Sequence, residues 1–337
     1  MARGRISDYL LAHLKRPPHR LEAPPTATGD LLVDDDLHLA LYVSYELHYR
    51  GFQDVAEEWE WEPSLLALRS QLEDGFTSAL VEDVGRPGPA DPADVEEALQ
   101  QTLARGDGPS LSTYMAEQGT LDNFREFAVH RSAYQLKEAD PHTWCIPRLA
   151  GDAKAALVLI QADEYGNGRP EEVHAERFAV TMDALELDRA YGAYLDHIPG
   201  VTLATVNLVS MFGLHRRWRG ALVGHLAIFE MASVVPMGRY AAALRRLGVG
   251  SPGVDFYDVH VAADEVHQVV ALQHMARAFA RQEPERAGDV LFGARAIMTT
   301  EQRFAEHLLG AWARGETSLH RPLVPIGAGS RVAARNG

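Results

Sequence analysis

The sequence contains very little cysteine. Cys145 is the only cysteine among 337 residues, so the chain cannot form an internal disulfide, and such sparse usage is typical of a reducing compartment. The N-terminal stretch lacks the apolar run and the small-residue cleavage site of a signal peptide. No segment approaches the ~20 consecutive apolar residues of a membrane helix. We therefore expect a soluble, cytoplasmic protein without a membrane partner.

Basic residues are scarce relative to acidic ones. The chain has 32 Lys and Arg residues against 47 Asp and Glu residues, which gives a net charge of −15. Because binding to phosphates requires a basic surface, this balance argues against nucleic acid as the main partner. Hydrophobic residues make up 46% of the chain, which is enough for the core of one large domain or two modest ones.

Alternating apolar and polar runs, which are typical of β-strands, are missing, and so are internal repeats. Apolar residues recur instead at helical spacing in four segments, residues 35–52, 62–85, 217–248 and 257–282. Gly85 is placed to end the second segment, and Pro236 predicts a kink in the third. We predict an all-α bundle of long helices.

The predicted helices fall into two groups along the chain. Residues 1–112 form an N-terminal helical region, residues 113–316 form the main helical domain, and residues 317–337, rich in Pro, Gly, Ser and Arg, form a loose tail.

Several acids and histidines stand in or beside apolar helices. Glu230 has apolar neighbours at positions 226, 227, 228, 231 and 234 around much of its helix. A buried, unpaired carboxylate is costly, so such a group is paired, protonated or bound to metal. Glu138 and Glu164 each end an apolar helix, and His174 opens the helix that follows. Taken singly, the last two glutamates are also explained as helix-end charges.

The stretch "VHVAADEVHQ" at residues 259–268 carries His260, Asp264 and His267. These residues are four and then three positions apart, so in a helix they share one face. By itself this pattern is more often a solvated polar face than a metal site. Combined with the three glutamates and His174, it fits a carboxylate-bridged pair of metal ions in a helix bundle.

The types of ligand indicate which metal such a site would bind. Carboxylates with imidazoles suit iron or manganese, whereas structural zinc prefers cysteine in a closed tetrahedron. None of Glu138, Glu164 and Glu230 has a histidine three residues later. The Glu-x-x-His signature of ferritin-like bundles is therefore absent, and we do not expect the ferritin fold.

Four motifs resemble a known family. "KEADPHTWCIPRLAG", "IQADEYGNG" with the following "VHAERFA", "VTLATVNLVSMFGLHRRWRGALVGHLAIFEM" and "FYDVHVAADEVH" are similar in order and separation to motifs of the haem-oxygenase-like di-iron oxidases and oxygenases. These proteins are often labelled iron-containing redox enzymes. The similarity covers about residues 120–280. The chain is also similar to the central N-oxygenase domain of the N-nitrosourea-forming enzyme of streptozotocin biosynthesis, which N-hydroxylates the guanidine of a methylated arginine.

This resemblance implies a seven-helix, haem-oxygenase-like bundle without haem, and an N-terminal helical region that helps to form a homodimer. It also implies a set of iron ligands, which are at the same time the catalytic residues: Glu138, Glu164, His174, Glu230, His260, Asp264 and His267. Residues that lie near these motifs and are expected to line a polar substrate pocket are Tyr134, Lys137, Trp144 and Tyr165.

The chemistry implied by the resemblance is O2 activation by two ferrous ions per chain, through a peroxo-di-iron(III) species, with an external reductant and a small-molecule substrate. We expect N-oxygenation of an amine or guanidine, because the ligand set that includes Glu138 resembles that of the N-oxygenases. The alternative is C–C cleavage, desaturation or decarboxylation of an amino or fatty acid. A third possibility of another class is a metal-free helical binding protein.

Overall fold

Every regular element in the part of the chain that the structure describes is helical. The computed structural model describes residues 1–106 and 108–323, and no strand occurs in them, which confirms the all-α prediction. The α-helices are α1 (Arg5–Leu14), α2 (Asp35–Glu46), α3 (Pro63–Val84), α4 (Val95–Ala104), α5 (Leu111–Glu117), α6 (Leu121–Gln135), α7 (Asp140–Thr143), α8 (Gly151–Glu164), α9 (His174–Ala184), α10 (Gly200–Leu214), α11 (Arg219–Arg246), α12 (Ser251–Val269), α13 (Arg277–Gln282) and α14 (Ala287–Ala313).

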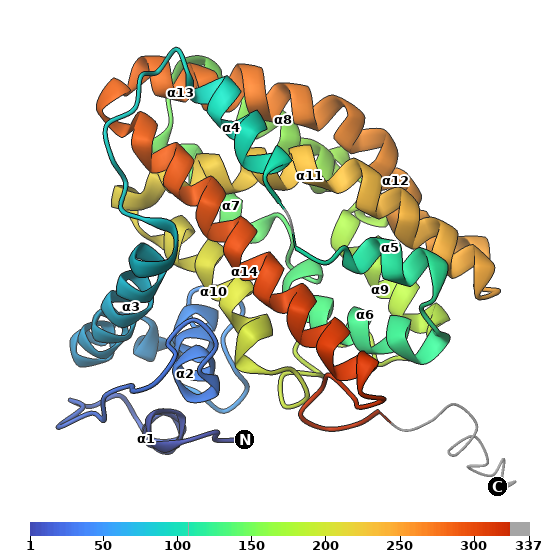
Figure 1. Cartoon of the computed structure of the whole chain (residues 1–337). Coiled ribbons are helices and arrows are strands. Elements are labelled where there is room, and N and C mark those ends of the chain that lie inside the picture. The colour runs from blue at the N-terminus through green and yellow to red at the C-terminus, as the bar shows by residue number, and fades with distance from the viewer. Residues whose placement is uncertain (107, 324–337) are drawn as a thin grey trace, which may run out of the picture.

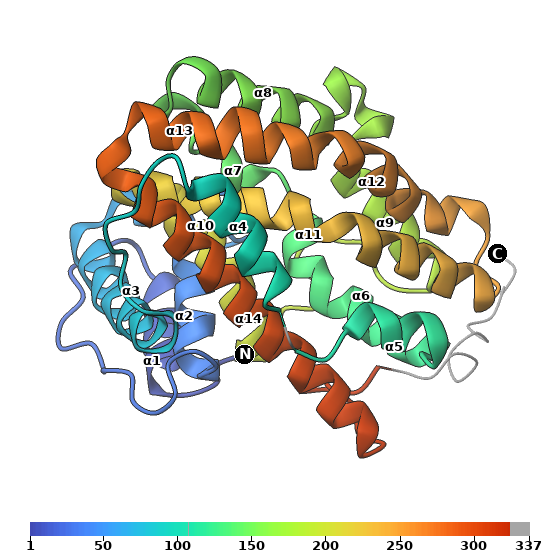
Figure 2. The same cartoon turned by 45° about the horizontal axis from the view of Figure 1, so that its top comes forward.

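The longest helix, α11, runs through the middle of the molecule (Figure 1). It packs mainly against α12 on one side and α14 on another. A π-helical turn, η6 (Val270–Ala276), continues α12 and packs on α8, while α9 packs on α12 and α6. Figure 2 shows α8, α12 and α13 together at one face of the bundle, above α11. Helices far apart in sequence therefore meet around the centre of α11.

Local sequence signals explain where several helices begin and end. The Asp34 carboxylate accepts a hydrogen bond from the Leu37 N–H at 2.7 Å and so caps α2. Helix α3 ends immediately before Gly85, whose φ of 78° lies in the left-handed region that glycine adopts without strain. Thr120 and Asn123 form a reciprocal capping box at the start of α6. Helix α11 continues through Pro236, where the sequence predicts a kink.

The length and apolar composition of the helix that contains α11 differ from what we expected from the sequence. Residues Arg216–Arg246 form a helix long and apolar enough, by length and composition alone, to cross a membrane, and no segment of this kind was expected. In the structure 61% of its most apolar window is buried inside the bundle. Such burial is typical of the core helix of a bundle. Composition alone does not distinguish a core helix from a membrane-spanning helix.

The N-terminal helices share their core with the rest of the chain. Helix α2 packs on α10, and α4 packs on α14 and α11. One continuous hydrophobic cluster includes Ile6 and Leu10 of α1 as well as residues of α14. The proposed division at residue 112 stays a prediction.

The predicted loose tail begins with residues that are packed. Ser318 is buried, and its N–H and hydroxyl both donate to the Glu126 carboxylate, at 2.9 and 2.6 Å. Its hydroxyl also lies 3.0 Å from Nε2 of the buried His130. The rest of the tail, residues 324–337, lies outside the described residues.

The crossing of α11 and α14 depends on glycine. A Cβ added at Gly224 would lie 1.8 Å from the Val290 carbonyl oxygen, so Gly224→Ala must push the two helices apart. We expect it to lower the free energy of unfolding by about 1–3 kcal/mol or more. Gly238→Ala in the same helix is the control, since its Cβ would meet only Val261 Cγ2 at 3.8 Å. That variant should be neutral or gain about 0.5–1 kcal/mol. Equal losses in urea unfolding of both variants would contradict this account.

Candidate metal centre

The seven side chains expected to bind metal come together at the centre of the bundle, and all of them are buried. Glu138 lies in the turn between α6 and α7, Glu164 ends α8, His174 opens α9, Glu230 lies in the middle of α11, and His260, Asp264 and His267 follow one face of α12.

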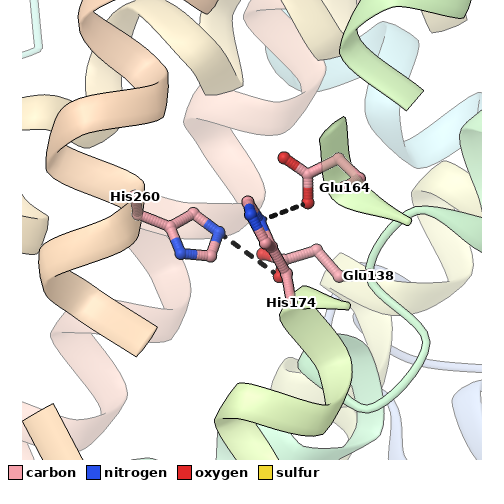
Figure 3. A group of neighbouring side chains, drawn as sticks. All are labelled: Glu138, Glu164, His174 and His260. Atoms are coloured by element: carbon pink, nitrogen blue, oxygen red, sulfur yellow. Dashed lines mark ion pairs between the residues drawn. The ribbon is translucent and has the colours of Figure 1, made fainter. Parts of the chain in front are cut away.

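The first group of ligand-type atoms consists of Glu138, Glu164, His174 and His260, which each offer one atom within 4.8 Å of the others. His174 Nδ1 lies 2.8 Å from Glu164 Oε2, and His260 Nε2 lies 3.4 Å from Glu138 Oε2. Figure 3 shows the two imidazoles and the two carboxylates pointing toward one another from separate elements.

The second group consists of Glu164, Glu230 and His267, again with one atom each within 4.8 Å of the others. His267 Nδ1 lies 3.5 Å from Glu230 Oε2 and 3.8 Å from Glu164 Oε1. Each group includes a histidine of α12, and the two groups have one member in common.

Glu164 is that common member, and its two oxygens face different groups. Oε2 is the oxygen close to His174 in the first group, whereas Oε1 is the oxygen close to His267 in the second. A carboxylate placed in this way can bridge two cations, one at each oxygen.

Asp264 borders the second group without being part of it. Its Oδ1 lies 3.8 Å from His267 Nδ1, and its Oδ2 accepts a hydrogen bond from the Ser233 hydroxyl at 2.5 Å. The structure thus brings Asp264 to the site, with one oxygen held by Ser233 and the other facing His267.

Two of the histidines are oriented in the manner of metal ligands. A ligating imidazole commonly donates its second N–H to a carbonyl or carboxylate, which fixes the ring. His260 Nδ1 lies 2.7 Å from the Phe256 carbonyl oxygen, leaving Nε2 to face Glu138. His267 Nε2 lies 3.2 Å from Asp163 Oδ2, leaving Nδ1 to face Glu230.

The electrostatics of the metal-free cluster follow from burial and close opposite charges. Burial raises the pKa of Glu230 to about 8. Burial alone would lower the pKa of His260, but Glu138 raises it to about 10. For His267 the attraction of Glu230 likewise outweighs burial and raises the pKa to about 9. At neutral pH the cluster as a whole therefore holds protons, which metal binding would displace.

Buried atoms without a hydrogen bond test whether metal ions suit this cluster. Four buried ligand-type atoms form no hydrogen bond: Glu138 Oε2, Glu164 Oε2, His174 Nδ1 and His267 Nδ1. Each faces an opposite charge of the cluster without hydrogen-bond geometry, and all four belong to the two groups. Buried polar atoms without a hydrogen bond cost free energy. Carboxylate oxygens with imidazole nitrogens are a donor set that iron accepts. The residues present therefore fit a pair of iron ions.

Beside the cluster lies a small cavity of about 20 Å³, which is room for about one water-sized molecule. Its lining includes four residues that the sequence analysis did not single out: His142, Gln161, Phe229 and Ser233. Gln161 Nε2 donates to the Ala139 carbonyl at 2.7 Å and so holds the turn that carries Glu138.

Helical spacing could have identified three of these four residues. His142 follows Glu138 by four positions, Gln161 precedes Glu164 by three, and Ser233 follows Glu230 by three. Each therefore stands one helical turn from an expected ligand, although the chain around Glu138 and His142 is not one continuous helix.

The four residues expected to line a polar substrate pocket lie in different places. Tyr134 lines the small cavity. Lys137 is buried elsewhere, with its ammonium 2.9 Å from Glu46 Oε2. Trp144 packs edge-to-face with Tyr49. The Tyr165 hydroxyl donates to Asp140 at 2.9 Å. Of the four, only Tyr134 lines the cavity beside the cluster.

The buried pair of Lys137 and Glu46 ties α2 to the turn that carries Glu138. The Tyr191 hydroxyl also donates to Glu46. We expect Glu46→Leu to lower the free energy of unfolding by about 3–5 kcal/mol, because it leaves the Lys137 charge buried without a partner. The double variant Glu46→Leu/Lys137→Met removes both charges and should recover most of this loss. Equal urea midpoints for the single and double variants would contradict the expected role of the pair.

One comparison with known proteins is informative. The profile of a family described as iron-containing redox enzyme matches residues 125–302, which is more than half of the chain and includes all seven expected ligands. No curated protein matches the chain. The all-helical fold is consistent with the haem-oxygenase-like fold of this family.

Proposed function

The chain belongs to the family of iron-containing redox enzymes, and from this premise we propose that it is an O2-activating non-haem di-iron oxidoreductase. The observation that carries the proposal is the position of Glu164 between two groups of buried ligand-type atoms. One shared carboxylate between two sets of donors is the arrangement expected for two adjacent ions rather than one.

The proposed ligands divide between two ions. Glu138, His174 and His260 would hold the first ion, Glu230 and His267 the second, and Glu164 both. Asp264 would complete the second set through the oxygen that faces His267. When bound, an iron pair supplies the electrons that reduce O2 and thereby drives oxidation of the substrate.

The protein's own residues would orient these ligands and limit access to the site. Asp163 and the Phe256 carbonyl fix the tautomers of His267 and His260. Ser233 orients Asp264. Tyr134 and Phe229 pack edge-to-face at 5.5 Å on the wall of the small cavity. This wall would keep bulk water from the site while leaving space for a molecule the size of O2.

For the reaction itself we propose N-oxygenation of a small amine or guanidine, because Glu138 adds a carboxylate to the ligand set as in the N-oxygenases that the sequence resembles. A second candidate is oxidation of a carboxylic acid by C–C cleavage, desaturation or decarboxylation. A specific observation favours it: among the described residues, the larger cavity behind Tyr134 and Phe229 is lined by Arg105, Arg131 and Arg239 and by one carboxylate, Glu301.

The proposal also includes partners. A reductant outside the chain would return the iron to the ferrous state. We propose a homodimer and a cytoplasmic location, on the grounds of the family resemblance and of the sparse cysteine.

The test is anaerobic loading of metal-free protein with Fe(II), removal of unbound iron, and measurement of iron per chain and of O2 uptake on mixing. We expect two irons per chain and O2 uptake that depends on them. His267→Gln should lower both quantities. His274→Gln, at an exposed histidine on η6, should change neither.

Two outcomes would contradict the proposal. An iron content well below two per chain that His267→Gln leaves unchanged would exclude the proposed di-iron site and favour a metal-free binding protein. Full iron loading without O2 uptake would leave a metal site but exclude O2 activation.

A further inference from the structure

A second, larger cavity, of about 570 Å³, lies behind the wall formed by Tyr134 and Phe229. Most of its lining comes from α6, α11 and α14. Tyr134, Phe229 and Ser233 line both this cavity and the small one beside the cluster. A molecule in the larger cavity is therefore separated from the proposed ligands by a single layer of side chains.

The larger cavity extends along α11, away from the metal centre. Its lining on this helix includes Phe229, directly before Glu230, and Tyr240. A rise of 1.5 Å per residue separates the two aromatic residues by about 16 Å along the helix axis. Phe229 packs on Tyr134, with 5.5 Å between the ring centroids, and Tyr240 packs on Phe127, at 4.7 Å. The cavity therefore has one aromatic pair at its metal end and another at its far end.

Gln135, a buried amide, lines the cavity at its metal end. It is the last residue of α6, next to Tyr134 and three residues before Glu138. The residue is 4% exposed, and its Oε1 is buried without a hydrogen bond. Such an unpaired acceptor costs free energy, which a ligand that donates a hydrogen bond would recover. This amide therefore indicates a ligand at the metal end of the cavity.

The group that Gln135 offers to a ligand is polar but uncharged. Its amide has an oxygen that accepts hydrogen bonds and an NH2 that donates them, and rotation about the last side-chain bond exchanges the two with little change in shape. The oxygen can turn to the cavity, because no hydrogen bond holds it. A neutral N–H group is the matching partner, since an amide does not offset the cost of burying a cation.

The arginines of the lining are solvated or paired. Arg105 and Arg239 are exposed. Arg131 donates to both oxygens of Glu301, at 2.9 and 2.6 Å. The uncharged amide of Gln135, rather than these groups, therefore meets the end of a ligand that reaches the metal centre.

The walls of the cavity are rich in aromatic rings. Among the described residues, five aromatic side chains line it: Phe127, Tyr134, Phe229, Tyr240 and Phe304. Aromatic ligands pair with such rings in edge-to-face or offset arrangements, and apolar walls with a few polar groups are typical of small-molecule sites. An amino group attached directly to an aromatic ring suits both the walls and the amide. The ring delocalises the nitrogen lone pair, so that this group is neutral at pH 7, whereas an alkylamine is a cation.

We propose that the larger cavity is the substrate site, and that its substrate is a neutral aromatic amine whose ring lies among the aromatic side chains and whose amino group donates an N–H to Gln135. This inference rests on the proposed function for the identity of the centre, and it narrows the amine of that proposal to one class. Gln135 selects a neutral nitrogen over a cationic one, and it holds that nitrogen at the wall shared with the small cavity.

The test is titration calorimetry with both metal-free and anaerobically Fe(II)-loaded protein, so that a failed metal site cannot mimic a failed substrate site. The probes are para-butylaniline, its cationic isomer with the amine at the end of the butyl chain, and the anion para-butylbenzoate. We expect para-butylaniline to bind at least tenfold more tightly than the other two in both forms of the protein. Gln135→Leu should weaken this binding by about 2–10-fold, which is the effect of losing one neutral hydrogen bond. Gln273→Leu, at an exposed glutamine of η6, is the control and should leave it unchanged.

Urea unfolding separates a loss of binding from a loss of the fold. Gln135→Leu removes an unpaired buried amide, so the ligand-free variant should unfold at a urea concentration no lower than that of the wild type. An unchanged affinity for para-butylaniline in this variant would overturn the proposal, and so would equally tight binding of the cationic isomer. Tightest binding of para-butylbenzoate would also overturn it, in favour of the oxidation of an acid. If any of these results occurred with normal iron content and O2 uptake, the di-iron function would stand and only the substrate class would fall.

Discussion

Replacement of Glu164 by alanine is expected to remove both irons from the protein, whereas His174→Ala and His267→Ala should each remove one. The reason is the geometry of the carboxylate: Oε2 faces His174 and Oε1 faces His267, so no other single residue belongs to both groups. Removing an outer partner of a ligand costs about 10–100-fold in metal affinity or activity. Loss of a ligand shared by two ions should therefore lower O2 uptake by more than about 100-fold.

The measurement is iron per chain after anaerobic loading and desalting, with O2 uptake recorded on the same samples. Asp163→Asn is the matched control, because Asp163 contacts His267 Nε2 at 3.2 Å but lies outside both groups. It should weaken the second site without emptying the first. If Glu164→Ala retains as much iron as His174→Ala, the shared role of Glu164 is wrong.

Replacement of Glu230 by leucine is expected to have opposite effects on stability and on iron binding. In metal-free protein the Glu230 carboxylate is buried beside Glu164 and Asp264, whose charges oppose its ionisation. Its opposite charge, His267 at 3.5 Å, keeps Asp163 and Glu164 as partners when Glu230 is removed. We therefore expect an apolar residue of similar volume to stabilise the metal-free fold by about 1–4 kcal/mol. The same change removes a proposed ligand of the second ion. The variant should therefore unfold at higher urea than the wild type when metal-free, yet gain less stability from iron.

The stabilisation of metal-free protein by Glu230→Leu should depend on pH in one direction. Burial raises the pKa of Glu230 from 4.5 to about 8, so the folded metal-free protein binds a proton here that the unfolded chain has released. The ionisation of Glu230 therefore lowers the free energy of unfolding of the metal-free protein by an amount that grows as the pH rises from 4.5 towards 8. The advantage of Glu230→Leu in metal-free protein should be larger at pH 8 than at pH 5.

Urea unfolding of metal-free and iron-loaded samples at both pH values measures these effects. Glu265→Leu, at an exposed glutamate of α12, should change stability by no more than about 0.5 kcal/mol. A loss of stability in metal-free Glu230→Leu would show that the contact with His267 stabilises the fold, and an undiminished response to iron would exclude Glu230 as a ligand.

The sequence was sufficient for the helical fold and for the set of residues that meet at the centre. His260, Asp264 and His267 share a face because helical spacing is local, and Glu230 stands out because its neighbours are apolar. The shared position of Glu164 could not be predicted. It depends on how the end of α8 meets α11 and α12, and no periodicity within one segment reports such a contact.

Proximity in sequence to the expected ligands did not predict which residues line the cavities beside the cluster. Lys137 and Tyr165 directly adjoin Glu138 and Glu164, yet the structure places Lys137 on Glu46 and Tyr165 on Asp140. Successive residues in helices and turns point in different directions, so the neighbour of a ligand usually faces away from it. The residues of the larger cavity lie instead one or more helical turns away, as Ser233 does from Glu230.

The most direct test of the proposed di-iron centre is the anomalous scattering of iron in crystals of anaerobically Fe(II)-loaded protein. The account predicts two peaks on either side of Glu164. One should lie within coordination distance of Glu138, His174 and His260, and the other within that distance of Glu230 and His267. A single peak, or iron bound away from Glu164 in fully loaded crystals, would contradict it.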